Sequence, residues 1–180
     1  MLRITVPATE QFDEVKGEFV TTKEQTLQLE HSLVSLSKWE AKWCKPFLYT
    51  DHKTDEETID YIKCMTITQN VKPEVYQCLT AENIKQIQEY IYAPMTATVI
   101  SENKHGKKNR EIITSEVIYY QMIALNIPFE CEKWHLNRLI TLIRVCDIKN
   151  QPAKKMSSGE IKRRNAALNA ARRKKLNTKG

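Results

Sequence analysis

Two pairs of residues near position 131 have a spacing that could support chemistry. Glu132 and His135 lie three residues apart in a predicted helix, so they would share a face and could ligate a metal. A di-iron bundle needs two such motifs and further carboxylates. Cys131 and His135 lie four residues apart, but a catalytic thiol needs a lowered pKa and an oriented base. We therefore expect a half-buried thiol and a surface histidine, and predict no enzyme activity, catalytic residue, metal or cofactor.

A run of carboxylates between Asp51 and Asp60 could perform acid–base chemistry. Thr54 and Glu57, however, have the spacing of a capping box, and a helix N-terminus favours acidic side chains. The run is explained more simply as the start of a helix. Motifs that bind phosphate through glycine are absent, because only Gly17 and Gly106 occur in residues 1–150.

The elements that would position these residues belong to an α+β fold with a mostly helical body. Alternating apolar and polar residues predict a strand at Leu2–Val6, and two runs that favour β structure predict strands at Glu18–Thr22 and Thr26–Glu30, joined as a hairpin. A second small β-hairpin is predicted from Thr96–Ser101 and Arg110–Ile113, on either side of the polar loop Glu102–Asn109. Solvation of the cations in that loop is the simpler expectation, although they could contact phosphate.

Apolar residues at helical spacing and capping signals predict six helices in the body. The strongest signal is at Cys131–Val145, where Trp134, Leu139 and Ile143 would face the core. The others are Ser32–Lys42, a helix opened by Thr54, Pro73 through Cys78, a helix capped by Thr80 and stopped by Pro94, and Ser115–Leu125.

Charge divides the chain into a body at 1–150 and a basic tail at 151–180. The whole chain has 28 Lys and Arg against 22 Asp and Glu, but residues 151–180 hold ten cations and one acid, a net charge of +9. Ser157 and Glu160 can cap a helix in the tail. We predict that this helix binds a polyanion or an acidic partner, and nucleic acid without sequence preference, through Lys162, Arg163, Arg164, Arg172, Arg173, Lys174 and Lys175.

Aromatic and arginine side chains around the strongest helix are candidates for a partner-binding surface. Trp and Arg are common anchors of protein interfaces. The candidates are Trp134 and Arg138, with Tyr119 and Tyr120 on the preceding helix. The alternative is that Trp134 belongs to the core and the others are solvated.

The cysteines and the apolar stretches indicate the compartment. Five cysteines with no CxxC spacing and no secretory start predict reduced thiols in a cytoplasm-like compartment. The most apolar stretch, Val117–Phe129, is shorter than the ~20 residues that span a bilayer. We therefore expect a soluble protein that does not contact membranes.

Three blocks of the sequence, Leu29–Glu40, Glu111–Arg144 and Asn165–Gly180, resemble a family of small proteins encoded in the tail-gene region of tailed bacteriophages. The resemblance spans most of the chain and includes no catalytic motif. It implies a tail assembly chaperone in the host bacterial cytoplasm, acting within a complex or oligomer. Such a chaperone coats the helical tape measure protein, helps to recruit major tail protein, and leaves before the tail is finished.

An alternative hypothesis is a virion or morphogenesis component whose basic tail binds DNA or an acidic virion surface. The two hypotheses predict different contents of the purified mature virion. A chaperone should be absent from it, and a structural component should be stoichiometric.

Overall fold

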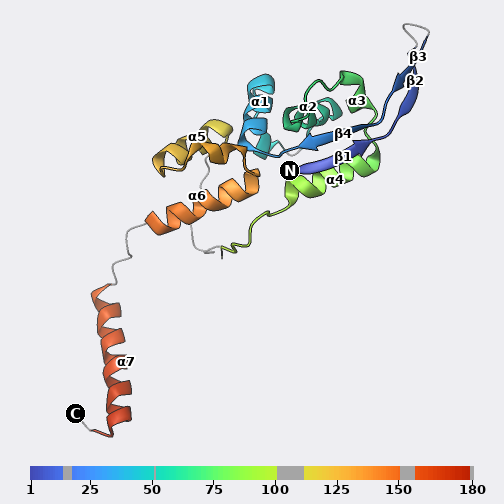
Figure 1. The fold of residues 1–180 in the computed structure, drawn as a ribbon. Helices are drawn as coiled ribbons and strands as arrows, with labels where there is room; N and C mark the ends of the chain where they lie inside the picture. The colour runs from blue at the N-terminus through green and yellow to red at the C-terminus, as the bar shows by residue number, and fades with distance from the viewer. Residues whose placement is uncertain (14–17, 51, 101–111, 151–156, 179–180) are drawn as a thin grey trace. The chain divides into compact units, whose positions relative to one another are not determined.

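The computed structural model describes residues 1–13, 18–50, 52–100, 112–150 and 157–178, and they form an α+β fold, as predicted (Figure 1). By their internal contacts the residues divide into two units, Met1–Asp147 and Ile148–Gly180. The division at residue 150 stays a prediction. The described helices are α1 (Leu33–Trp43), α2 (Asp55–Met65), α3 (Pro73–Gln77), α4 (Ala81–Tyr92), α5 (Ser115–Ala124), α6 (Leu136–Asn150) and α7 (Ser158–Leu176), with 3-10 helices η1 (Phe47–Tyr49) and η2 (Phe129–Lys133).

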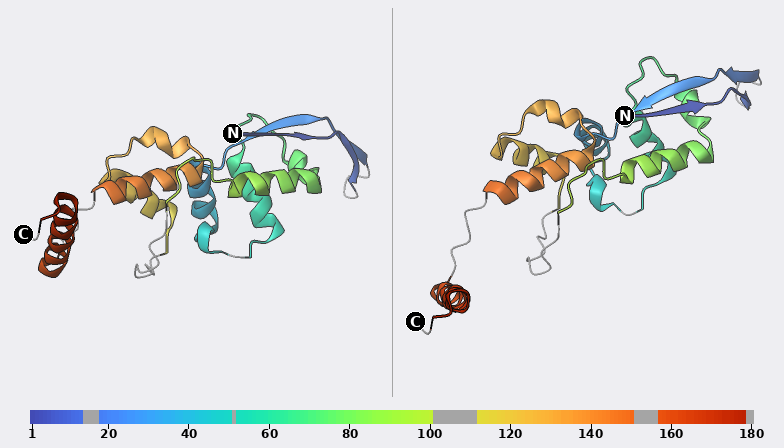
Figure 2. Two further views of the ribbon diagram at one scale, coloured as in Figure 1. Left: turned by 90° about the horizontal axis from the view of Figure 1, so that it is seen from below. Right: turned by 60° about the horizontal axis from the view of Figure 1, so that its bottom comes forward.

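The four strands in the described part of the chain form two antiparallel ladders that share one register. Strand β1 (Leu2–Val6) pairs with β4 (Gln25–Leu29), and β2 (Thr9–Asp13) pairs with β3 (Glu18–Thr22). Val6 lies opposite Gln25 and Thr9 lies opposite Thr22. The same number of residues separates the two pairs on each side of the hairpin, so the second ladder continues the register of the first across the gap between them. Pro7 lies at the gap and has no N–H to donate. The two ladders are therefore successive parts of one long, bent hairpin (Figure 2).

This pairing corrects one prediction. Glu18–Thr22 is a strand, but its partner is β2 rather than the strand that follows it. Strand β2 was missed because its sequence, TEQFD, lacks a clear alternation of apolar and polar residues. The segment that joins β2 to β3 lies outside the described residues.

The prediction of a second hairpin at Thr96–Ser101 and Arg110–Ile113 is wrong where it can be compared. Residues 96–100 and 112–113 are described and form no strand, and the loop Glu102–Asn109 lies outside the described residues. Val99 is 93% exposed. A β-branched run is stable as a strand when one face packs against other residues, and here that packing is missing.

The core lies between the inner face of the hairpin and the helices around it. Ile4 and Leu27 lie opposite each other in the β1–β4 ladder and are both buried. Helix α4 packs against β1, and α1 packs against both α2 and α5. The side chains with almost no exposure include Leu33, Leu36, Trp39, Ile62, Met65, Met122, Leu136 and Leu139.

Local capping signals position most helix ends. Thr54 and Glu57 form the predicted capping box of α2, and Thr80 caps α4 together with Asn83. Ser157 and Glu160 form the predicted box of α7. In each box two side chains satisfy backbone N–H groups that have no partner within the helix.

The strongest predicted helix, Cys131–Val145, is wrong at its start. Residues 129–133 form η2, Trp134 has an extended backbone, and α6 begins only at Leu136. The break is caused by a contact distant in sequence, because the Leu136 N–H donates to the His31 carbonyl at 2.7 Å. Trp134 therefore lies outside the helix and is only half-buried, while Leu136, Leu139 and Ile143 form the buried side of α6.

Helix α7 buries none of its residues. Asn177, in the left-handed conformation with φ of 53°, ends it. Among the described residues, no helix is long and apolar enough to cross a membrane.

Candidate partner-binding groove

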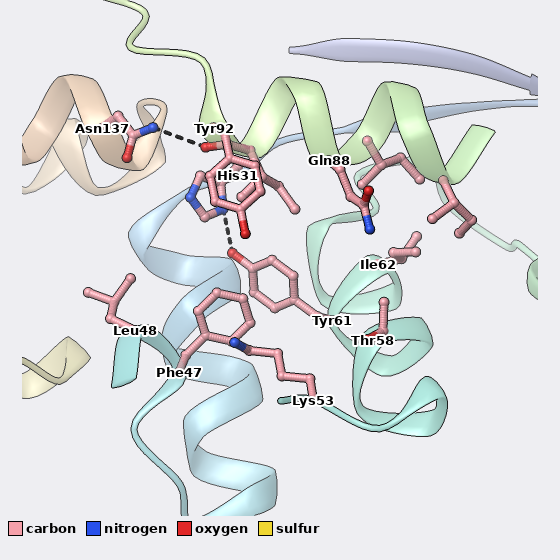
Figure 3. A pocket seen from close by; sticks show the side chains of 13 residues that line it. His31, Phe47, Leu48, Lys53, Thr58, Tyr61, Ile62, Gln88, Tyr92 and Asn137 are labelled. Carbon is pink, nitrogen blue, oxygen red and sulfur yellow. Dashed lines mark hydrogen bonds between the residues drawn. The ribbon is translucent and has the colours of Figure 1, made fainter. Parts of the chain in front are cut away.

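One cavity of the body is a half-open pocket of about 410 Å³ between α2, α4 and η1 (Figure 3). His31 and Tyr61 point toward each other in it, with His31 Nδ1 at 2.5 Å from the Tyr61 hydroxyl. The Phe47 ring stacks on the Tyr61 ring, and the Lys53 ammonium lies 4.1 Å from the centre of the Phe47 ring. The pocket thus combines aromatic faces with a few polar groups.

The imidazoles of His31 and His135 lie beside each other, with their ring centres 5.1 Å apart. Burial and the nearby His135 lower the pKa of His31 to about 3, so the His31 ring is neutral at neutral pH. His135 is buried, which corrects the expectation of a surface histidine. Its Nε2 donates to the Tyr90 carbonyl at 3.0 Å, and its Nδ1 accepts the Asn137 N–H at 3.3 Å. These bonds join the end of α4 to the start of α6.

The residues of the two pairs that could support chemistry, Glu132–His135 and Cys131–His135, make other interactions in the structure. The Glu132 carboxylate accepts a hydrogen bond from the Tyr119 hydroxyl at 2.9 Å, instead of pairing with His135. Burial raises the pKa of the Cys131 thiol, the opposite of what an activated nucleophile requires. In the part of the chain that the structure describes, no three His, Cys, Asp or Glu side chains gather as metal ligands.

The acidic run joins α1 to α2. The Lys45 ammonium lies 2.5 Å from Glu57, and this hydrogen bond lowers the pKa of Glu57 together with the bond from the Thr54 backbone. Asp60 accepts hydrogen bonds from Lys42 at 2.6 Å and from the Trp43 indole at 3.0 Å. These contacts support the structural interpretation of the run.

One buried carboxylate escaped the sequence analysis. Glu40 is 7% exposed and accepts the backbone N–H of Phe47 at 2.9 Å and that of Ser115 at 2.7 Å. Thr114, the residue before α5, makes no capping hydrogen bond with its side chain. Glu40 on α1 therefore caps α5 from another helix.

A second cavity, of about 540 Å³, is an open groove between η1, α5 and α6. We call it the α5–α6 groove. Ile118 and Ile143 are buried beneath it, whereas Tyr120 is 68% exposed and Leu48 is 40% exposed. The lining is mainly apolar or aromatic, and its other side chains are those of Gln121, Arg144 and Asp147. The lining residues are Leu48, Tyr49, Ile113, Ile118, Tyr120, Gln121, Ala124, Leu125, Ile140, Ile143, Arg144 and Asp147.

Of the four predicted partner-binding residues, Tyr120 lines the α5–α6 groove and the other three do not. The Arg138 guanidinium stacks on the Trp134 ring at 4.2 Å from its centre. Tyr119 packs beside Phe129 and bonds to Glu132, and burial together with that bond raises its pKa to about 12. The structure therefore does not gather the four residues in this groove.

Sequence reasoning missed the η1 side of the groove. Leu48 lies two residues after Pro46, in a stretch too short for a periodic pattern of apolar residues. The sequence did contain a pattern that could have identified Ile140 as a groove residue. Ile140 adds a second apolar side to α6, next to the side formed by Leu136, Leu139 and Ile143.

The predicted polyanion-binding residues, Lys162 to Lys175, all lie on α7 and are exposed. They belong to the second unit, Ile148–Gly180. In comparisons with protein-family models, curated proteins and solved structures, nothing matched the chain.

Proposed function

We propose that this protein is a phage tail assembly chaperone, which binds the tape measure protein and helps tail polymerisation. The observation that supports the proposal is the α5–α6 groove, where large apolar side chains such as Tyr120 and Leu48 remain exposed around an apolar floor. Contiguous exposed apolar surface is typical of sites that bind another protein. The resemblance of the sequence blocks supplies the identity of the partner.

The groove suits an amphipathic helix. Helix-in-groove recognition places side chains at i, i+3, i+4 and i+7 of the bound helix into an apolar channel. A tape measure protein is long and helical and would present many such stripes. Binding in this groove would keep those stripes from aggregating until tail protein replaces the chaperone.

The test is the affinity of the full chain for a helical segment of the tape measure protein. Tyr120→Ala should weaken binding about 30-fold or more, because truncating an aromatic hot-spot residue costs about 2 kcal/mol or more. Tyr92→Ala is the matched control, since Tyr92 is 82% exposed but lies outside the groove. Equal affinity of the two variants would contradict the proposal.

A second candidate function is a virion or morphogenesis component that binds DNA or an acidic virion surface. The observation that favours it is α7, an exposed helix with seven cations between Lys162 and Lys175. Mass spectrometry of purified virions separates the two functions. A stoichiometric amount in mature virions would favour the structural component, and absence would favour the chaperone.

A further inference from the structure

The positive charge of α7 is distributed around the whole helix rather than on one side. Successive residues of an α-helix are rotated by about 100°. Lys162 and Arg173 therefore project within about 20° of each other. Lys175 lies about 200° around the helix from Arg173, so it projects from the opposite side.

A second set of cations repeats this arrangement on two further sides of the helix. Arg163 and Lys174 project within about 20° of each other, and Arg172 lies about 180° from Arg163. All of these side chains are exposed, and α7 buries none of its residues. A surface laid along one side of α7 would therefore leave the cations of the other side in solvent.

The remaining side chains of α7 favour contacts made by charge. The stretch between the two runs of cations is NAALNAA, and four of its residues are alanine. Glu160 is the one acidic residue in the sequence of α7. The helix thus has small side chains in its middle and long cationic side chains toward both ends.

We infer that α7 bridges two DNA duplexes, each of them held by the cations on one side of the helix. Duplex DNA is stiff over about 150 base pairs, so a short duplex cannot wrap around α7 to reach every cation. A second duplex on the opposite side can meet the remaining cations, and each of these contacts releases counterions and adds to the affinity. The inference concerns α7 alone and does not rest on the proposed chaperone function.

The sequence of α7 disfavours two other partners. A protein groove binds a helix through apolar residues at i, i+3, i+4 and i+7, but the residues at i+3 and i+4 from Ile161 are Arg164 and Asn165. Binding to single strands uses aromatic side chains on which the bases stack, and α7 contains none. Duplex phosphates therefore suit α7 better than an apolar protein groove or unpaired bases.

The salt dependence of binding reports how many cations contact one duplex. Each contact adds about −0.9 to the slope of log affinity against log salt. With about three cations toward each duplex, the affinity for a single duplex should have a slope of about −3. A helix with all seven cations on one side would have a slope of about −6.

The experiment measures bridging by energy transfer between two short DNA duplexes of the same sequence. One duplex carries a donor dye and the other an acceptor dye, and the full chain is titrated into their equimolar mixture at about 50 mM salt. Energy transfer should rise while the protein is scarce and fall when it is in excess, because each duplex then binds its own copies. Fluorescence anisotropy of one labelled duplex gives the salt slope separately.

The test variant collects all the cations of α7 on one side without changing its composition. Four pairs of residues exchange places: Arg163 with Asn165, Arg164 with Ala166, Asn169 with Lys174, and Lys175 with Leu176. The cations then lie within an arc of about 120°. This variant should bind a single duplex with a slope of about −6, but should give no energy transfer between duplexes.

The control variant also exchanges four pairs of residues but keeps the charge on every side. Each pair is seven residues apart, so every cation moves by only about 20° around the helix. The pairs are Arg163 with Ala170, Ala166 with Arg173, Ala167 with Lys174, and Leu168 with Lys175. The control should keep the energy transfer and the slope of about −3 of the unchanged chain.

Three results would overturn the inference. The first is no energy transfer at any ratio of protein to DNA. The second is equal energy transfer or an equal salt slope for the unchanged chain and the one-sided variant, which would mean that the placement of the cations around the helix has no effect. The third is loss of energy transfer in the control variant, in which the charge still surrounds the helix.

Discussion

Replacing Glu40 with alanine tests how a single buried carboxylate holds three segments together. Its two oxygens accept the N–H groups of Phe47 and Ser115, which lie 7 and 75 residues away along the chain. Alanine would leave both N–H groups buried without a partner. An unsatisfied buried donor costs about 1–3 kcal/mol, so Glu40→Ala should lower the free energy of unfolding by about 2–6 kcal/mol.

Urea unfolding followed by the fluorescence of the three tryptophans measures this loss. Glu40→Gln retains one acceptor oxygen, so it should cost about half as much as alanine. Glu89→Ala is the matched control, because Glu89 is exposed on α4 and its loss should stay within about 0.5 kcal/mol. A loss below about 1 kcal/mol for Glu40→Ala would refute the assignment of Glu40 as the cap of α5.

Three further predictions concern stability. Leu139→Ala should cost about 2–5 kcal/mol in denaturant unfolding, because Leu139 is fully buried on α6; a loss under about 1 kcal/mol would mean that another side of α6 faces the core. The pKa of His31 is lowered to about 3 in the folded protein, so its stabilising effect is complete above pH ~6.5 and is lost as pH falls toward 3. Between pH 7.5 and 5 the free energy of unfolding should fall by about 2 kcal/mol through His31, and an unchanged pH dependence in His31→Gln would contradict this. Deleting residues 151–180 should change the free energy of unfolding by less than about 0.5 kcal/mol, because α7 buries no side chain; a larger loss would show that α7 stabilises the body.

Features encoded by neighbouring residues could be predicted from the sequence. The capping boxes at Thr54 and Ser157 and the start of α3 at Pro73 depend on residues within one helical turn. Strands Leu2–Val6 and Glu18–Thr22 were predicted with the bounds that the structure has. In these cases the propensity of the segment and its tertiary environment favour the same conformation.

Features set by distant contacts could not be predicted. The start of α6 is shifted because Leu136 bonds to His31, more than 100 residues away. The partner of β3 depends on the register of the whole hairpin, which begins at Leu2 opposite Leu29. The α5–α6 groove likewise needs η1 beside α5 and α6, and no local pattern brings Leu48 and Tyr120 together.

Site-specific photo-crosslinking in infected cells tests the central claim most directly. The photoreactive amino acid p-benzoylphenylalanine would replace Tyr120 in the α5–α6 groove, and Val99, which is exposed outside the groove, would be replaced as the control. We predict that position 120 crosslinks to a helical segment of the tape measure protein during assembly and that position 99 does not. No crosslink to the tape measure protein from position 120, or equal crosslinking from both positions, would contradict the proposal that this groove binds it.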